Sequence, residues 1–393
     1  MTWTLWEVSV CILVIMALMF QAAIVCFATM VTFVCLRPFS NDLYQKQLTR
    51  ILSYWSQNLI GLIQMTAPSK MVFYFDKSCP PSTHIVNSTT TDQQQKNHQY
   101  SPTGDLNFPD RTIVISNHQI YADWIYVWFI AYLAKAHGSL KIMLKNELKY
   151  TPFFGLGMQL FDFIFMKRRL ADDKDTIIQN LERSKTGGKP MWLVLFPEGT
   201  VISKEMRTRS QAYAVKNGMN DNLYTLLPRS TGLKLCTATL ENTVEWMYDL
   251  TIGYSGIQAG QIPEDALRLK HIFTGCGPQE IHVHIRRYHV SELALDDDAA
   301  FSKWVMDRWV EKDKRMEQFY EEGRFTSFDH NDNPGDGCAS PLLGGGHTYT
   351  VPIRLRHPLK ESLDLWLYMV PYIPVLYLFY SLVSYLLILY NYH

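Results

Sequence analysis

The sequence shows no excess of either charge and no cysteine framework. Its 393 residues contain 37 lysines and arginines against 37 aspartates and glutamates, so net charge gives no support for a nucleic-acid partner. Its seven cysteines form no CxxC pair and no disulfide pattern. We therefore expect a body of one large or two ordinary domains that faces the reducing cytosol.

The N-terminal region lacks charge over a long run. Residues 8–36 contain no Asp, Glu, Lys, Arg or His, and a helix needs only about 20 apolar residues to cross a bilayer. A cleavable signal peptide is the alternative, but Glu7 stands where its basic residues would be, and the run is too long. The run predicts a transmembrane anchor over residues 8–36.

The basic residues beside this run indicate its orientation. Arg37, Lys46 and Arg50 follow it, whereas Glu7 is the only charged residue before it. Because basic residues are retained on the cytosolic side of a span, the chain from residue 37 onward is predicted to be cytosolic.

A second uncharged run, rich in aromatic residues, covers residues 365–392. Pro371 and Pro374 interrupt it, so it predicts a C-terminal membrane segment that either spans with a kink or forms a shallow hairpin. Arg354 and Lys360 precede it and again favour the cytosol for the middle of the chain.

Three further segments lie outside the predicted domain. Residues 43–66 carry apolar residues at helical spacing, which predicts either an interfacial amphipathic helix on the cytosolic leaflet or a helix packed on the body. Residues 88–105 form a polar loop, and residues 326–358 are likewise poor in packable side chains. Both are predicted to be flexible.

Between residues 110 and 325, apolar strand-like runs alternate with helical ones. This alternation predicts a catalytic α/β domain, in which helices flank a mainly parallel sheet. The predicted strands are 111–116, 140–144, 162–166, 191–196, 247–254 and 280–287, and the predicted helices are 121–136, 174–184 and 298–322.

The stretch SNHQIYADW, residues 116–124, places His118 and Asp123 five positions apart. Five residues are about 140° apart on a helix, so contact between the two side chains requires His118 to precede the helix, at the strand-to-helix junction. Open α/β sheets place their ligands at such junctions. The pair is either a general base with its orienting carboxylate or two polar residues near each other by chance.

Three other polar groups follow apolar strands or begin a helix. Glu198, Gly199 and Thr200 end the strand WLVLF, Arg168 belongs to the basic end of FIFMKRR, and Arg229 begins a helix after LP. Guanidinium groups suit phosphate. The alternatives are a plain turn for the first group and a solvated basic cap for the second.

In their order along the chain, these blocks resemble the glycerolipid acyltransferase family, which includes the 1-acylglycerol-3-phosphate acyltransferases. Two further stretches, LKNELKYTPFFGLGMQ and RSQAYAVKNG, are similar to the branch of lysocardiolipin and lysophosphatidylinositol acyltransferases. Each block is weak alone, and four in order are strong. The blocks are N-H-x4-D at 117–123, the basic end of 163–168, F-P-E-G-T at 196–200 and L-P-R-S-T-G at 227–232.

The resemblance implies transfer of a fatty acyl chain from acyl-CoA to the free hydroxyl of a lysophospholipid at a bilayer, with no metal and no cofactor beyond the co-substrate. His118 is then the general base and Asp123 its orienting partner. Val201 departs from the pattern, because many members have arginine there. The residues expected to bind the acceptor are Arg168, Glu198, Gly199, Thr200 and Arg229, with Glu198 aiming the arginines.

The same chemistry predicts the shape of the site. Glu198 should face the cleft that holds His118. An apolar wall that includes Trp124 and Phe129 should continue from His118 toward the membrane, because each buried methylene of an acyl chain is worth about 0.8 kcal/mol.

Four other functions remain open. A serine hydrolase would use GYSGI (253–257), which lacks the second glycine of G-x-S-x-G. His282 and His284 share one face of a strand, as zinc ligands can, but no third ligand is obvious. The others are a CoA-independent transacylase and an inactive membrane scaffold. The endoplasmic reticulum is favoured over mitochondria because no Arg/Ser-rich presequence precedes Val8.

Overall fold

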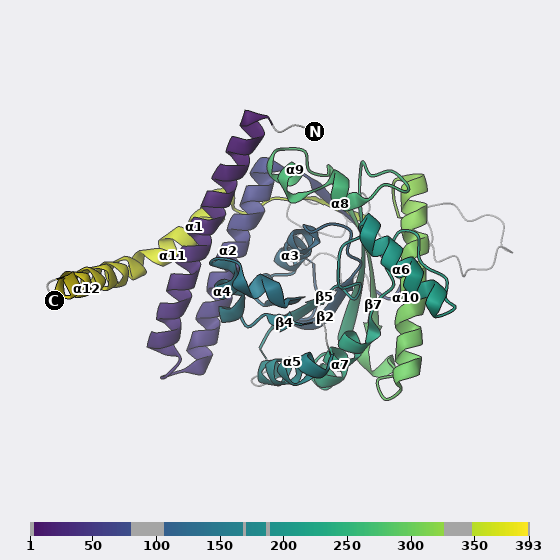
Figure 1. Ribbon diagram of the computed structural model, residues 1–393, viewed down its shortest axis with the longest axis horizontal. Helices are drawn as coiled ribbons and strands as arrows, with labels where there is room; N and C mark the ends of the chain where they lie inside the picture. The colour runs from purple at the N-terminus through teal and green to yellow at the C-terminus, as the bar shows by residue number, and fades with distance from the viewer. Residues whose placement is uncertain (1–3, 80–105, 168–169, 186–188, 326–347, 392–393) are drawn as a thin grey trace, which may run out of the picture.

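The computed structural model describes residues 4–79, 106–167, 170–185, 189–325 and 348–391, and an eight-stranded sheet lies at its centre (Figure 1). The strands lie side by side in the order β4-β3-β5-β2-β6-β7-β1-β8. Their bounds are β1 Lys70–Phe75, β2 Arg111–Ser116, β3 Leu140–Lys145, β4 Ile164–Met166, β5 Met191–Leu195, β6 Trp246–Tyr254, β7 Glu280–His289 and β8 Thr348–Pro352.

Most neighbouring strands run parallel. Five of the seven pairings are parallel, and only β6 with β7 and β1 with β8 are antiparallel. The predicted α/β class with a mainly parallel sheet is therefore confirmed. Parallel pairing brings the carboxyl ends of β2, β3, β4 and β5 to one edge of the sheet, where the functional residues gather.

Helices cover both faces of the sheet, which explains why β5 is apolar throughout and β2 is apolar at its centre, over residues 113–115. One face packs on α2 and α3, and the other on α5, α7 and α10. The helices are α1 Leu5–Leu36, α2 Asn41–Thr66, α3 Asp123–Leu133, α4 Phe154–Leu160, α5 Leu170–Lys185, α6 Lys204–Lys216, α7 Ser230–Leu240, α8 Pro263–Ala266, α9 Leu269–Phe273, α10 Asp298–Glu322, α11 Pro358–Met369 and α12 Ile373–Asn391.

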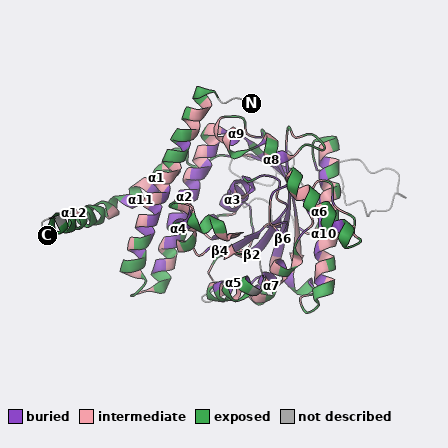
Figure 2. Ribbon diagram, viewed as in Figure 1, coloured by how far each residue is buried: buried purple, intermediate pink, exposed green. Residues whose placement is uncertain are grey.

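Helix α2 carries the amphipathic pattern of residues 43–66. Its apolar stripe lies against protein, because Ile51, Ile60 and Ile63 are fully buried in the core that also contains α3. Figure 2 shows this purple stripe between α1 and the body. The structure therefore corresponds to the packed helix, and the same face is not open to lie on a leaflet.

The C-terminal segment 365–392 is helical on both sides of its prolines. Helix α11 passes through a short 3-10 turn at Val370–Tyr372 into α12, which projects away from the body rather than folding back (Figure 1). Of the two predicted arrangements, the structure has the kinked helix over its described residues, not the hairpin.

Two predicted loops have different outcomes. The loop 88–105 lies outside the described residues. The prediction of a loop over residues 326–358 is wrong at its end, because β8 pairs antiparallel with β1 from residue 348 and α11 begins at Pro358. Tyr349 and Val351 are buried and alternate with residues that are not, so this short segment has the alternating pattern of a strand at the edge of a sheet.

Candidate active site

His118 lies in the turn between β2 and α3, as the spacing predicted. Its Nδ1 lies 2.8 Å from Oδ2 of Asp123, the first residue of α3, so the predicted contact is confirmed. The His118 ring is 16% exposed, and the ring of Phe196 stacks on it at 4.4 Å between centroids. The imidazole is thus held on two sides and still reaches solvent or a substrate.

The Asp123 carboxylate is fully buried and surrounded by donors. Besides His118, the backbone N–H groups of Gln119 and Ile120 donate to it at 2.6 and 3.1 Å, and so does the Tyr254 hydroxyl. A carboxylate with four donors is an acceptor only, so it fixes the proton of His118 on Nδ1. The lone pair is then on Nε2, where a general base needs it.

The buried Asn117 anchors the same turn to the neighbouring strand. Its amide donates to the carbonyl of Ile252 at 2.9 Å and accepts from the N–H of Ile252 at 2.8 Å. These two bonds to β6 continue the backbone hydrogen bonding between β2 and β6 past Ser116, where β2 ends. The turn that presents His118 is therefore fixed to the sheet by a side chain.

Glu198 faces the same turn, and within the described residues its carboxylate bonds N–H groups and not Arg229. Its buried carboxylate accepts from the backbone N–H groups of His118 and Leu226, each at 3.2 Å, and from the indole N–H of Trp309 at 3.1 Å. Burial raises the pKa of Glu198 to about 8, and these three donors oppose that rise. Glu198 therefore ties the His118 turn to the segment before α7 and to α10, and the expectation that it also aims Arg168 concerns a residue outside the described part of the chain.

Gly199, Thr200 and Arg229 lie together beside His118 along one cavity. Gly199 has φ +71°, a left-handed conformation that permits the sharp turn after β5. The N–H of Arg229 donates to the carbonyl of Pro197 at 2.9 Å, which joins the two blocks directly. Arg168 lies outside the described residues.

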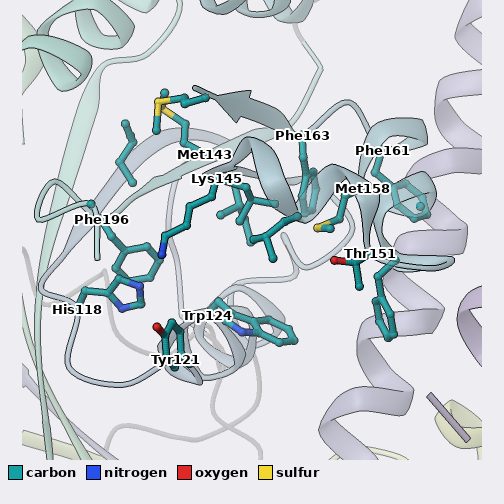
Figure 3. A pocket seen from close by; sticks show the side chains of 18 of the residues that line it. His118, Tyr121, Trp124, Met143, Lys145, Thr151, Met158, Phe161, Phe163 and Phe196 are labelled. Carbon is teal, nitrogen blue, oxygen red and sulfur yellow. The ribbon is translucent and has the colours of Figure 1, made fainter. Parts of the chain in front are cut away.

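The cavity has a volume of about 740 Å³ and is mainly apolar. It extends from His118 to α1 and α2 (Figure 3). Trp124 lines it as predicted, whereas Phe129 does not, because it points into the core beneath α3. The apolar lining that α1, α2 and α4 contribute includes Ala22, Val25, Cys26, Trp55, Phe154 and Met158.

Sequence reasoning missed Lys145. This residue ends β3, and Figure 3 shows its ammonium group directed toward Phe196 and His118. The available signal was its place at the carboxyl end of a strand, the same place that singled out the basic end of β4. The site therefore contains a second described cation besides Arg229.

At the two rival sites, His282 and Ser255 make structural bonds. His282 bonds the Tyr74 hydroxyl at 2.9 Å and Glu280 at 3.0 Å, and within the described residues no group of three or more His, Cys, Asp or Glu is placed to hold a metal. The Ser255 hydroxyl accepts from the N–H of Glu280 and does not line the cavity.

Comparison with known proteins identifies the family. Residues 95–241 match the Acyltransferase family model, and residues 271–342 match the model of the acyltransferase C-terminus. An uncharacterized acyltransferase of Saccharomyces cerevisiae is 31% identical over 82% of this chain and 85% of that protein. Lysocardiolipin acyltransferase 1 of Danio rerio is 35% identical over 67% and 68%.

A third relative is the 2-acyl-1-lysophosphatidylinositol acyltransferase of Saccharomyces cerevisiae, which is 36% identical over 55% of this chain. The match spans 63% of that protein's length. With the ordered blocks in one site and two relatives matched over two thirds of their length, the chain belongs to the glycerolipid acyltransferase family.

Proposed function

We propose that the protein is an acyl-CoA-dependent O-acyltransferase that esterifies the free hydroxyl of a lysophospholipid. The observation that carries this proposal is the His118–Asp123 pair at the end of an apolar cavity that also holds Arg229. A base, a place for an acyl chain and a cation for a phosphate are the three elements that this reaction requires.

His118 supplies the base. The acceptor hydroxyl attacks the thioester carbonyl while Nε2 of His118 takes its proton, because an alcohol is too weak a nucleophile otherwise. The tetrahedral intermediate then expels coenzyme A as a thiolate, whose pKa is about 8.5 if it resembles free cysteine. The proton on His118 passes to that thiolate, so ester and free thiol are the products and His118 is neutral again.

The apolar cavity supplies the site for the acyl chain. Side chains of α1, α2 and α4 line it together with Trp124 and Phe163, and an acyl chain that enters it leaves water at about 0.8 kcal/mol per methylene. This geometry supports a long-chain acyl donor whose thioester lies beside His118.

Arg229 and Lys145 supply positive charge near His118. Both line the cavity, and both lie beside the carboxyl ends of parallel strands. Such an arrangement favours the phosphate of a lysophospholipid, since charge-assisted bonds to phosphate are short and strong. Lysophosphatidylinositol, lysophosphatidic acid and lysocardiolipin all carry the required phosphate and hydroxyl. We place the enzyme at the endoplasmic reticulum membrane with its body in the cytosol, and expect it to need no cofactor.

The test is an acceptor screen on the purified full chain with one fixed acyl-CoA. Esterification of at least one lysophospholipid that stops without acyl-CoA supports the proposal. Transfer at an undiminished rate without any acyl-CoA contradicts it and favours the transacylase, which takes its acyl chain from a phospholipid.

Arg229→Ala is expected to raise the KM for the acceptor by about 10- to 100-fold, because a charge-assisted hydrogen bond contributes about 1.5–3 kcal/mol. The KM for acyl-CoA should change much less, since Arg229 contacts the phosphate of the acceptor. Steady-state kinetics with each substrate varied in turn measure both values.

Arg209→Ala is the matched control. Arg209 is an exposed arginine of α6 that pairs with Glu205 and does not line the cavity, so both KM values should stay near wild type. Equal effects of the two substitutions on acceptor KM would contradict a phosphate site at Arg229.

A further inference from the structure

Both ends of α1 contact the same body. Near its start, α1 packs against α9, which carries Lys270 and His271. Near its end, the ring of Phe33 packs on that of Tyr44 in α2 at 5.8 Å between centroids, and both residues line a cavity of about 700 Å³ with residues at the start of β3. The body therefore lies beside α1 near both of its ends (Figure 1).

This contact is incompatible with a helix that crosses a bilayer. With 32 residues, α1 is about 48 Å long, whereas the hydrocarbon core is about 30 Å thick. If α1 crossed, the charged residues of α9 or the polar start of β3 would lie at hydrocarbon depth or beyond it. Irregular backbone and charges exposed to lipid are strongly unfavourable there.

The outer face of α1 is nevertheless apolar. It is far larger than the isolated apolar residues that soluble proteins expose. The opposite face is buried against α2 and α4 and carries small or polar residues such as Ala22, Ala28 and Thr29. The exposed residues of this outer face are Leu5, Trp6, Ile12, Leu13, Ile15, Met16, Phe20, Met30 and Val34.

Helix α12 has the opposite character. Between residues 373 and 390 no residue is buried, and 19 residues give about 28 Å, close to the thickness of the hydrocarbon core. The two elements that precede α12 are fixed beside α1. The ring of Trp366 in α11 stacks on that of Phe20 at 6.2 Å between centroids, and the hydroxyl of Tyr372 in the 3-10 turn lies 3.0 Å from that of Thr32. From there α12 points away from the body, beyond α1 (Figure 1).

We infer that α1 lies along one leaflet with its outer face in the lipid, and that α12, of the helices described, is the one that crosses the bilayer. The chain before α1 and the body are then on one side of the membrane, and the end of α12 is on the other. This arrangement replaces the transmembrane anchor predicted for residues 8–36. It rests on helix contacts and exposure, and it holds whether or not the proposed reaction is correct.

Epitope tags at the two ends of the full chain test this arrangement in sealed microsomes. Added protease should remove the N-terminal tag and leave the C-terminal tag intact until detergent opens the vesicles. Protection of the N-terminal tag would mean that α1 crosses, and loss of the C-terminal tag from sealed vesicles would mean that α12 does not. Either result overturns the inference.

Two matched substitutions sharpen the test, because each places one arginine at an exposed apolar position. Leu382→Arg puts a charge at the middle of α12 and should reduce protection of the C-terminal tag several-fold. Met16→Arg in α1 should leave both tags unchanged, since an arginine on a helix at the leaflet surface can reach the headgroups. The reverse pattern would show that α1 is the span.

Discussion

His118→Ala is expected to lower kcat by about 10²- to 10⁴-fold, with little change in either KM, because general base catalysis acts mainly in the transition state. In the proposed reaction, Nε2 of His118 takes the proton of the acceptor hydroxyl, and alanine has no group that can replace it. Turnover with saturating acyl-CoA and lysophospholipid measures the effect.

Asp123→Asn is the companion variant. Its amide cannot accept from His118 Nδ1, Gln119, Ile120 and the Tyr254 hydroxyl as the carboxylate does, and it favours the wrong tautomer of the histidine. Its kcat should also fall steeply. Near-normal turnover of folded His118→Ala would contradict the base assignment, and the turn at residues 116–124 would then be structural.

Most strands of the fold could be predicted because they contain apolar runs with clear ends. Residues 111–116 are identical to β2, and residues 298–322 are identical to α10. Strands β1 and β8 could not be predicted with the others. They lie outside the alternating region, and β8 is short and pairs with a strand more than 270 residues earlier along the chain.

The site was predictable only in part, for a similar reason. His118 and Asp123 are close in sequence, so spacing alone limited their geometry. Glu198 meets Trp309 from a helix more than 100 residues later, and nothing local indicates that its partners are N–H groups rather than arginines. Composition predicted a membrane helix over α1, but the inferred arrangement along one leaflet rests on what packs along that helix, and composition holds no information on tertiary contacts.

A buried ion pair between Lys312 and Asp249 holds α10, the helix that carries Trp309, against the sheet. Lys312 of α10 donates to the Asp249 carboxylate of β6 and to the carbonyl of Leu250 at 2.6 Å, and both charged side chains are almost fully buried. Burial lowers the pKa of Lys312, and Asp249 opposes that change. One helical turn earlier, Trp309 bonds Glu198, so the pair positions the helix that supports the His118 turn.

Lys312→Met should destabilise the protein by about 3–5 kcal/mol, because removing one partner leaves the Asp249 carboxylate buried and unpaired. In a domain of this size we expect the thermal unfolding midpoint to fall by about 10 °C, as scanning fluorimetry of the purified protein would measure. The control is Lys303→Met on the same helix, where the ammonium is exposed and pairs with Asp307 at the surface. It should shift the midpoint by no more than about 3 °C, since surface pairs contribute at most about 1 kcal/mol.

The double variant Lys312→Met with Asp249→Leu separates the charge from the packing. Replacing both partners by apolar side chains of similar volume removes the unpaired charge, so stability should return to near that of the wild type. If the double variant unfolds as early as Lys312→Met alone, the loss comes from the bonds that Lys312 makes to Leu250 and Thr251. If Lys312→Met alone unfolds within about 2 °C of wild type, the stabilising role of the buried pair is contradicted. An unpaired charge in this core should lower the unfolding midpoint by more than that.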